Sequence, residues 1–267
     1  MKLYSSETTP LPRARVVSIG VTPGTFSDVK EAIIASAHQG ESQTVCFPNA
    51  HMVVEAQQKP ELAQAVNSAD WVLADGVPLL WAVNRMYGYN QERVAGMDMM
   101  PALLERAAEE HIPVLFYGST TERLQEAAAV CHTRFPGLQI AGLISPPFRP
   151  LTPAEEEAEV AQIVQSGARL IFVALGCPKQ ELWMGRMRGR IPAVMLGIGG
   201  ALPILTGEHK RAPAWVRSMG LEWVFRLALE PRRLFRRYAT TNALYVWHLG
   251  RQLMGGQRTA LSGSNPL

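Results

Sequence analysis

Short apolar runs recur along the chain between residues 15 and 199, and they limit what the chain can fold into more than any other feature. Several of them, such as VLFYG and LIFVALG, are apolar at nearly every position. Strands buried on both faces have this composition, and amphipathic helical patterns separate most of the runs. The alternation predicts an α/β fold with a Rossmann-like, mostly parallel sheet flanked by helices. The predicted strands are residues 15–20, 44–48, 71–75, 113–118, 138–143, 169–176 and 193–199.

The helical patterns carry start signals of their own. Ser27 is a candidate cap for a helix over 28–39, and Pro153 opens a helix with acids in its first turn, where the helix dipole favours them. From Lys210 the alternation stops, and two helical segments are expected over 214–229 and 231–254. We therefore expect a flexible tail (1–14), an α/β domain (15–209), a helical appendage (210–254) and a disordered tail (255–267).

Composition further restricts the class of protein to which the chain can belong. With 47% hydrophobic and 18% charged residues, the chain can bury a sizeable core. Its three cysteines, Cys46, Cys131 and Cys177, are isolated, which favours a reduced cytosolic setting over a zinc site or disulfide framework. The N-terminus lacks the apolar run of a signal peptide. The longest uncharged stretch, 191–207, is shorter than the ~20 residues of a spanning helix.

Charge is distributed unevenly along the chain. Residues 210–267 hold ten Lys or Arg and two acids, a formal charge of +8, which leaves −5 for the rest of a chain whose net charge is +3. Within this segment Arg232 and Arg236 are four residues apart, as are Arg233 and Arg237, so each pair can share a helix face. Together with the aromatic residues between them, they fit an anionic membrane surface. A solvated charged face packed on the body fits the pattern equally well.

Small and polar residues follow five of the predicted strands. In open parallel sheets, ligands bind beyond the carboxyl ends of the strands, so these residues are expected to line one cleft. They are Asn49, Asp75, Gly118 with Ser119, Gly176 to Gln180, and Gly199 with Gly200. The segment 20–24, GVTPG, does not match the G-x-G-x-x-G fingerprint, which argues against a dinucleotide site.

Asp75 ends an apolar strand, where a carboxylate would face the cleft. The alternative is that Asp75 only caps the helix that begins near Pro78. The chain has four aspartates and no D-x-D pair, and its histidines form no metal-ligand spacing. We therefore expect neither a metal nor a cofactor, and phosphate charge would be met by side chains and helix ends.

Four other residues have both a functional and a plain structural interpretation. Lys179 and Gln180 follow Gly176 and Pro178 at a strand–helix turn, which can bind phosphate or simply connect two elements. Arg93 can bind a diphosphate in bidentate fashion, but a surface arginine is the commoner case. Asn49 can cap the next helix, with or without offering its amide to a ligand.

Several segments, in this order, resemble the WecG/TagA/CpsF family of bacterial glycosyltransferases. They are ADGVPLLW, RVAGMD, FYGS, LGCPKQELW, GIGG and KRAPAWVRSMGLEWVFRLALEPRRLFRRY, and together they extend over about residues 15–240. The resemblance implies inverting, metal-independent transfer of a sugar such as N-acetylmannosamine, its uronic acid or glucose. The donor would be a UDP-sugar and the acceptor a polyprenyl-diphosphate-linked sugar used in cell-surface polysaccharide synthesis.

The resemblance also implies roles for particular residues. Asp75 matches the family's proposed base, and Asn49, Arg93 and Gln180 match residues expected in the same pocket, with Gly118, Lys179, Gly199 and Gly200 beside them. Arginines of the C-terminal appendage, among Arg226, Arg232, Arg233, Arg236 and Arg237, would meet the lipid diphosphate or the membrane. The chain departs from the family pattern at Phe47, where a Thr is common, and at Pro203, where an Asp is expected.

The resemblance places the protein at the cytoplasmic face of the plasma membrane as a peripheral enzyme. No nucleic-acid partner is expected, and a homo-oligomer is left open. The alternative class is a non-catalytic module that binds a nucleotide or nucleic acid through its basic tail. Salt-sensitive binding to anionic liposomes but not to duplex DNA separates the two classes.

Overall fold

A computed structural model describes residues 12–255, except the side chains of residues 214, 218, 233, 236 and 237. The ends of the predicted tails therefore lie outside the described residues. Within that range the structure has eight strands, which are β1 (Ala14–Val16), β2 (Ile19–Val21), β3 (Gln43–Cys46), β4 (Trp71–Val72), β5 (Val114–Gly118), β6 (Ile140–Ile144), β7 (Leu170–Ala174) and β8 (Val194–Gly197).

Six of these strands form one sheet in the order β4-β3-β8-β7-β5-β6, and every neighbouring pair is parallel. The predicted α/β fold is thereby confirmed. The run at 15–20 is an exception, because β1 and β2 pair with each other in a separate antiparallel hairpin. Val17 adopts a left-handed φ of 56°, which turns the chain back between Val16 and Ile19, so this run cannot continue as one strand.

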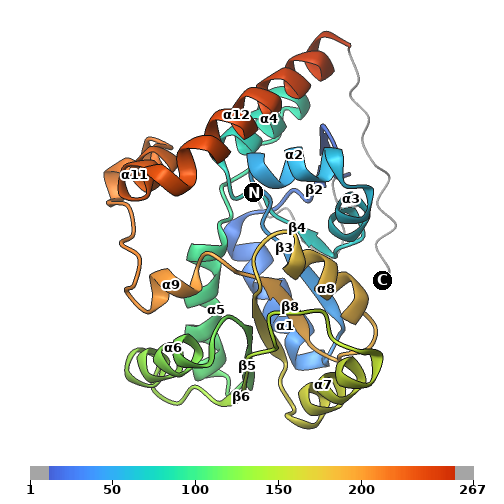
Figure 1. Cartoon of the computed structure of the whole chain (residues 1–267), viewed down its shortest axis with the longest axis vertical. Helices are drawn as coiled ribbons and strands as arrows, with labels where there is room; N and C mark the ends of the chain where they lie inside the picture. The colour runs from blue at the N-terminus through green and yellow to red at the C-terminus, as the bar shows by residue number, and fades with distance from the viewer. Residues whose placement is uncertain (1–11, 256–267) are drawn as a thin grey trace.

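Helices connect the strands in the order expected from the sequence (Figure 1). They are α1 (Phe26–Gln39), α2 (Ala50–Gln58), α3 (Pro60–Asn67), α4 (Val77–Tyr87), α5 (Gly96–Glu109), α6 (Thr121–Arg134), α7 (Pro153–Gln165), α8 (Lys179–Met187), α9 (Leu202–Leu205), α10 (Ala214–Ser218), α11 (Glu222–Leu229) and α12 (Pro231–Met254).

The sheet has a separate core on each face. One core joins it to α1, α5, α6 and α9, and the other to α2, α3, α7 and α8. Neighbouring residues of β5 point to opposite cores, as the period of a strand requires. Phe116 stacks on Phe172 in the first core at 5.4 Å between ring centroids, and Tyr117 stacks on Trp183 in the second at 4.2 Å.

Two predicted helix boundaries need correction. α1 begins at Phe26 rather than at residue 28, because the Oγ1 of Thr25, not of Ser27, accepts a hydrogen bond from the Asp28 amide at 3.1 Å. The predicted helix over 214–229 is two helices, α10 and α11. They are separated by Gly220, whose φ of 71° ends α10. The helix over 231–254 has the predicted bounds.

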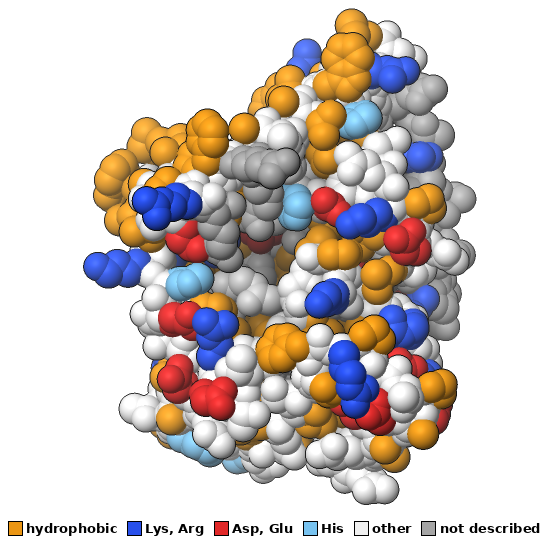
Figure 2. Space-filling model, in the orientation of Figure 1, with side chains coloured by type: hydrophobic (Ala, Val, Ile, Leu, Met, Phe, Trp, Pro, Cys, Tyr) orange, Lys and Arg blue, Asp and Glu red, His pale blue; other side chains and the backbone are white. Residues whose placement is uncertain are grey.

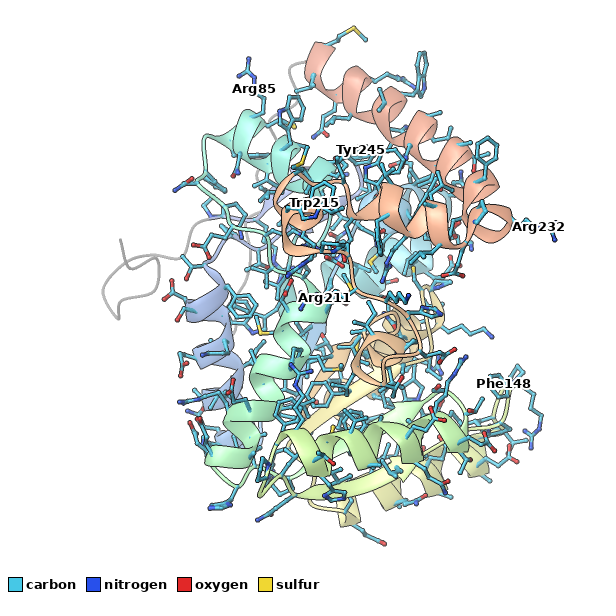
Figure 3. All side chains as sticks on the ribbon, turned by 90° about the vertical axis from the view of Figure 1, so that its left-hand side faces the viewer. Arg85, Phe148, Arg211, Trp215, Arg232 and Tyr245 are labelled. Atoms are coloured by element: carbon cyan, nitrogen blue, oxygen red, sulfur yellow. The ribbon has the colours of Figure 1, made fainter. Side chains whose placement is uncertain are left out.

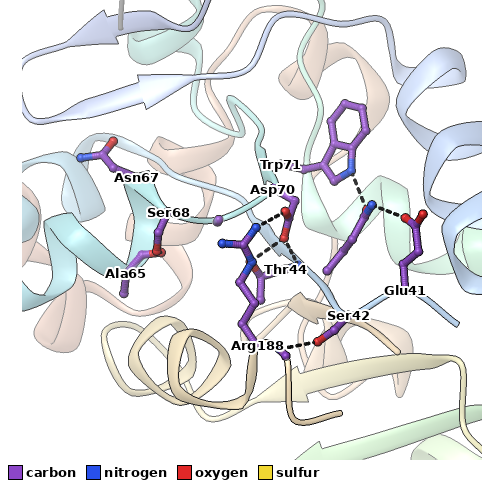
Figure 4. A network of polar contacts seen from close by, with 12 residues as sticks. Glu41, Ser42, Thr44, Ala65, Asn67, Ser68, Asp70, Trp71 and Arg188 are labelled. Atoms are coloured by element: carbon purple, nitrogen blue, oxygen red, sulfur yellow. Dashed lines mark hydrogen bonds and ion pairs between the residues drawn. The ribbon is translucent and has the colours of Figure 1, made fainter. Parts of the chain in front are cut away.

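A polar network ties the amino ends of β3 and β4 together (Figure 4). Asp70 accepts a hydrogen bond from the Thr44 amide at 2.9 Å and pairs with Arg188 at 2.5 Å. The indole of Trp71 donates to Gln43 at 3.1 Å. Asp70 therefore has a structural role at the edge of the sheet opposite the strand ends where ligands are expected.

The C-terminal helix α12 packs against α2 and lies beside α4 (Figure 1). It buries Leu234, Tyr245 and Leu249, and the hydroxyl of Tyr245 donates to the carbonyl of Pro78 at 3.0 Å. Near its end, Gln252 accepts from the Val17 amide at 2.8 Å. The helix is thus attached to the body along its length. Among residues 12–255, no helix is both long and apolar enough to cross a membrane.

Candidate active site

The parallel sheet brings the residues after five strands to one edge. Because β4, β3, β8, β7 and β5 are neighbours and run the same way, the segments that follow them emerge side by side. The segments after β4, β3, β8 and β7 carry Asp75, Asn49, Gly199 and Gly176, respectively, and Gly118 is the last residue of β5. Figure 2 shows a hollow in the face of the molecule between the C-terminal helices and the lower part of the body.

Asp75 lies in the loop between β4 and α4. Its amide donates to the Pro48 carbonyl at 3.0 Å, which fixes this loop against the end of β3. The N-cap of α4 is Gly76, and no side chain caps that helix, so the interpretation of Asp75 as a helix cap is wrong. A Cβ at Gly76 would lie 3.3 Å from the Cβ of Asn49, so the two loops are in contact.

Arg93 binds Asp75 through two groups. Its Nε donates to the Asp75 carbonyl at 2.6 Å, and its NH2 donates to Oδ1 at 3.1 Å. The loop that carries Arg93 is held by the amide of Val94, which donates to Ala74 at 3.1 Å, and by the buried Gln91, which exchanges two hydrogen bonds with Gly24. Arg93 is therefore no free surface residue.

The C-terminal segment supplies the second carboxylate of the cluster. Glu222, at the start of α11, accepts from the same NH2 group of Arg93 at 2.8 Å. Asp98, in the first turn of α5, lies 3.9 Å from NH1 of Arg93 and pairs with Arg211 and, at 3.7 Å, with Arg217. Arg211 lies between the C-terminal segment and α5 in Figure 3.

Arg226 reaches across the site from α11. Its NH2 group is 3.4 Å from the sulfur of Met97, at the start of α5. A Cβ at Gly200, after β8, would lie 3.8 Å from the same nitrogen. Four guanidinium groups, including Arg93, Arg211 and Arg217, are thus gathered with three carboxylates at this edge of the sheet.

The environment of Asp75 changes its acidity. The pKa of Asp75 is raised to about 6, chiefly by burial of the carboxyl group and also by the charge of Glu222, while Arg93 and Arg226 oppose the rise. A carboxylate with this pKa is mostly ionised at neutral pH and can still take up a proton there. These are the properties of a general base.

Gln180 joins the loops after β7 and β8. Its Oε1 accepts from the amides of Gly176 and Gly199, each at 3.2 Å, and its Nε2 donates to Glu181 at 2.8 Å. A Cβ at Gly199 would lie only 2.8 Å from this oxygen. Burial raises the pKa of Glu181. Gln180 therefore organises the strand ends, and its side-chain oxygen is occupied by two backbone amides.

The remaining predicted residues have varied surroundings. Asn49 caps α2, with Oδ1 accepting from His51 at 3.0 Å and Met52 at 3.2 Å, and it is exposed on the site side. Lys179 is exposed at the start of α8. Gly118 is buried, and a Cβ there would lie 2.8 Å from the Ala174 backbone, so strand packing accounts for this glycine.

Phe47 and Pro203 are the two positions at which the chain departs from the family pattern. Phe47 is buried, and its ring would lie 3.4 Å from a Cβ at Gly96, the first residue of α5. It belongs to the core rather than to the surface of the site. Pro203 lies in the first turn of the short helix α9.

Of the C-terminal arginines, Arg226 lies at the site, whereas Arg232 is exposed and points outward at the start of α12 (Figure 3). The side chains of Arg233, Arg236 and Arg237 lie outside the described residues. Within the described part of the chain, His, Cys, Asp and Glu form no group of three that can hold a metal ion.

The fold and the site define an α/β enzyme whose carboxylate and arginines meet at the carboxyl edge of a parallel sheet. The chain belongs to the WecG/TagA/CpsF family of glycosyltransferases, whose model matches residues 14–259. Membership makes the protein a glycosyltransferase of cell-surface polysaccharide synthesis.

Sequence reasoning did not assign site roles to Asp98, Arg211, Arg217 and Glu222. For Glu222 a signal was present, because it is one of only two acids in the basic segment from residue 210 onward. An isolated acid among basic residues is expected to form an ion pair. For Asp98 and the two arginines, only the ion pairs seen in the structure show that they lie together.

Proposed function

We propose that the protein transfers a sugar, with inversion and without a metal, from a UDP-sugar to a polyprenyl-diphosphate-linked sugar. The observation that carries the proposal is the Asp75–Arg93 pair at the carboxyl edge of the sheet, at 3.1 Å between NH2 and Oδ1. Family membership supports the reaction class.

Inverting transfer needs a base that removes the proton of the acceptor hydroxyl as its oxygen attacks the anomeric carbon. Asp75 would serve as this base, because its carboxylate is ionised at neutral pH and is held in one orientation by Arg93. General-base help typically contributes ~10²–10⁴-fold to a rate. Asn49, in the adjoining loop, would help to position the sugar through its amide group.

The departing nucleoside diphosphate carries the developing negative charge. The guanidinium of Arg226 lies beside Gly200 and α5, where it can meet an anion between the ends of β8 and β3. Lys179 lies at the start of α8, after β7, and is exposed to solvent. These two cations, with Arg93, would stabilise the diphosphate as it leaves.

A lipid-linked acceptor must be reached at a membrane surface, and the C-terminal helices present apolar side chains outward. Figure 2 shows hydrophobic side chains gathered along the upper rim, over these helices. The large exposed ones include Trp215, Phe235, Val246, Trp247 and Met254, and Trp81 of α4 is exposed as well. Exposed apolar groups on this scale favour a membrane interface.

The test is a panel of UDP-sugars presented with a synthetic short-chain polyprenyl-diphosphate sugar, with and without EDTA. Product of inverted anomeric configuration, formed with at least one donor in the presence of EDTA, would support the proposal. Products with retained configuration, or activity only with another nucleotide, would contradict it.

A further inference from the structure

We propose that Glu222 is a positioning residue of this active site. Its carboxylate binds Arg93, and this contact, which we call the latch, attaches α11 to the body of the protein. The same contact holds Arg93 in place against Asp75. The inference rests on the proposed role of Asp75, but the contact itself does not depend on which sugar is transferred.

The geometry places one guanidinium between two carboxylates. The NH2 group of Arg93 is 2.8 Å from Glu222 and 3.1 Å from Oδ1 of Asp75, and its Nε is 2.6 Å from the Asp75 carbonyl. Only 14% of the Glu222 side chain is exposed. Because an arginine fork has fixed geometry, a partner at one end also fixes the orientation of the other.

The side chains of α11 contribute little to the core, so its polar contacts at the site matter for holding the helix in place; Trp223 also packs edge-on against Tyr238 of α12, with 6.1 Å between ring centroids. None of the described side chains of α11 is fully buried, and Trp223, Val224 and Leu229 are exposed. The contacts that α11 makes at the site come from Glu222, to Arg93, and from Arg226, to Met97. Loss of the Glu222 contact should therefore loosen α11 more than an equal change in a helix that is packed into the core.

The same contact links the segment to the charge of Asp75. The groups that face Asp75 are Arg93 from the loop before α5, and Glu222 and Arg226 from α11, with Asp98 of α5 behind Arg93. Glu222 raises the pKa of Asp75 by like charge, whereas both arginines lower it. When α11 is in place, Arg93 keeps the Asp75 carboxylate oriented. The charge of Glu222 at the same time keeps the pKa of Asp75 from falling, so that Asp75 remains basic enough to take up a proton.

Two variants at Glu222 separate charge from contact, and both are made in the full chain. Glu222→Gln retains an oxygen that accepts from Arg93 but removes the negative charge. Glu222→Ala removes both. The matched control is Glu208→Gln, which neutralises another ion-paired acid, bound to Arg123 at 2.5 Å near the surface.

The first readout is hydrogen–deuterium exchange of residues 214–229 without substrate. We expect Glu222→Ala to speed exchange in this segment by at least ~5-fold, the effect of losing a coupling contact, and Glu208→Gln to leave it unchanged. The second readout is the pKa of Asp75 from NMR titration of ¹³C-labelled aspartates. The chain has only four, and Asp75→Asn assigns the signal. Glu222→Gln should lower this pKa by about half a unit or more.

Both readouts are independent of sugar transfer, so the latch and the proposed function can fail separately. Unchanged exchange in Glu222→Ala, or an unchanged Asp75 pKa in Glu222→Gln, would overturn the latch while leaving the transferase proposal intact. Faster transfer and tighter donor binding in Glu222→Ala would also overturn it, since Glu222 would then only occupy the place of a substrate anion.

Discussion

Arg93 holds Asp75 by its backbone and its side chain at once, with Nε 2.6 Å from the carbonyl and NH2 3.1 Å from Oδ1. The two contacts prevent the carboxylate from rotating away from the edge of the sheet. An aspartate that only capped a helix would need no such partner, and α4 has no side-chain cap. This relationship is the basis of the first two predictions.

Asp75→Asn should lower kcat by at least ~10²-fold, the usual effect of losing a general base. The amide is isosteric and can still accept from Arg93, so the thermal unfolding midpoint should change little. Asp28→Asn, on α1 and away from the site, is the matched control and should keep full activity. Activity of Asp75→Asn within a few-fold of wild type would show that the carboxylate takes no proton.

The pH dependence follows from the pKa of Asp75, which is raised to about 6. A general base works in its ionised form, so kcat/KM should be constant above this value and fall tenfold per unit as the pH decreases below it. The measurement is a pH–rate profile between pH 4.5 and 8, at the fixed ionic strength that charged sites require. An acid limb centred near pH 4, the value of an ordinary aspartate, would contradict the assignment.

Gly199→Ala should destabilise the protein, because its Cβ would lie 2.8 Å from Oε1 of Gln180 and would disrupt the two amide hydrogen bonds to that oxygen. Leaving a buried amide unsatisfied costs about 1–3 kcal/mol, and because these two amides are partly buried we expect a loss toward the lower end of that range, which urea unfolding can measure. Gly250→Ala is the control, since its Cβ meets nothing within 4 Å on α12 and alanine is the better helix former. Equal stability of the two variants would show that the loops can move apart.

Sugar transfer should survive EDTA. The chain has no D-x-D pair, and within its described part no group of three His, Cys, Asp or Glu side chains can hold a metal ion. In enzymes with a D-x-D pair, a bound metal usually neutralises the charge of the diphosphate. Here arginines would neutralise it instead. Loss of activity in EDTA that Mg²⁺ or Mn²⁺ restores would contradict this expectation.

The sequence predicted the sheet well, because strands buried on both faces leave continuous apolar runs such as VLFYG and LIFVALG. It also placed Asp75, Asn49 and Gly199 at strand ends, and the parallel topology brings them to one edge. The hairpin of β1 and β2 was not predicted, because it depends on the backbone conformation of Val17. Nor does local pattern reveal that Glu222 meets Arg93, 129 residues away.

The role of Gln180 could not be predicted from the sequence alone. Its position at a strand–helix turn left open a ligand contact or a plain connection, and in the structure its side-chain oxygen joins Gly176 and Gly199. A strand-end residue can serve a site by binding its ligand or by holding its loops, and only the hydrogen bonds distinguish the two. The same holds for Gly118, whose packing against Ala174 accounts for its lack of a side chain.

The membrane role of the C-terminal segment gives the last prediction. Its described arginines mostly face the body, since Arg211 and Arg217 pair with Asp98 and Arg226 lies at the site. The exposed groups are mainly apolar, with Trp215, Phe235 and Trp247 each more than 60% exposed. Binding to vesicles should therefore depend more on these aromatic side chains than on Arg232.

The decisive variant replaces Trp215, Phe235 and Trp247 with Ser in the full chain. Each is exposed, so the fold should be kept, whereas removal of everything after residue 209 would also uncover the surfaces that Tyr245 and Leu249 bury. Co-sedimentation with vesicles containing anionic lipid should fall at least ~10-fold for the triple variant, because burial of each aromatic ring favours binding by about 1.5–3 kcal/mol. Arg232→Gln should reduce binding less, by about 1 kcal/mol and in a salt-dependent way. Transfer to a short-chain, water-soluble acceptor should stay within a few-fold of wild type in both variants. Equal sedimentation of the triple variant and the wild type would show that this apolar face serves another contact, and the membrane role would have to be given up.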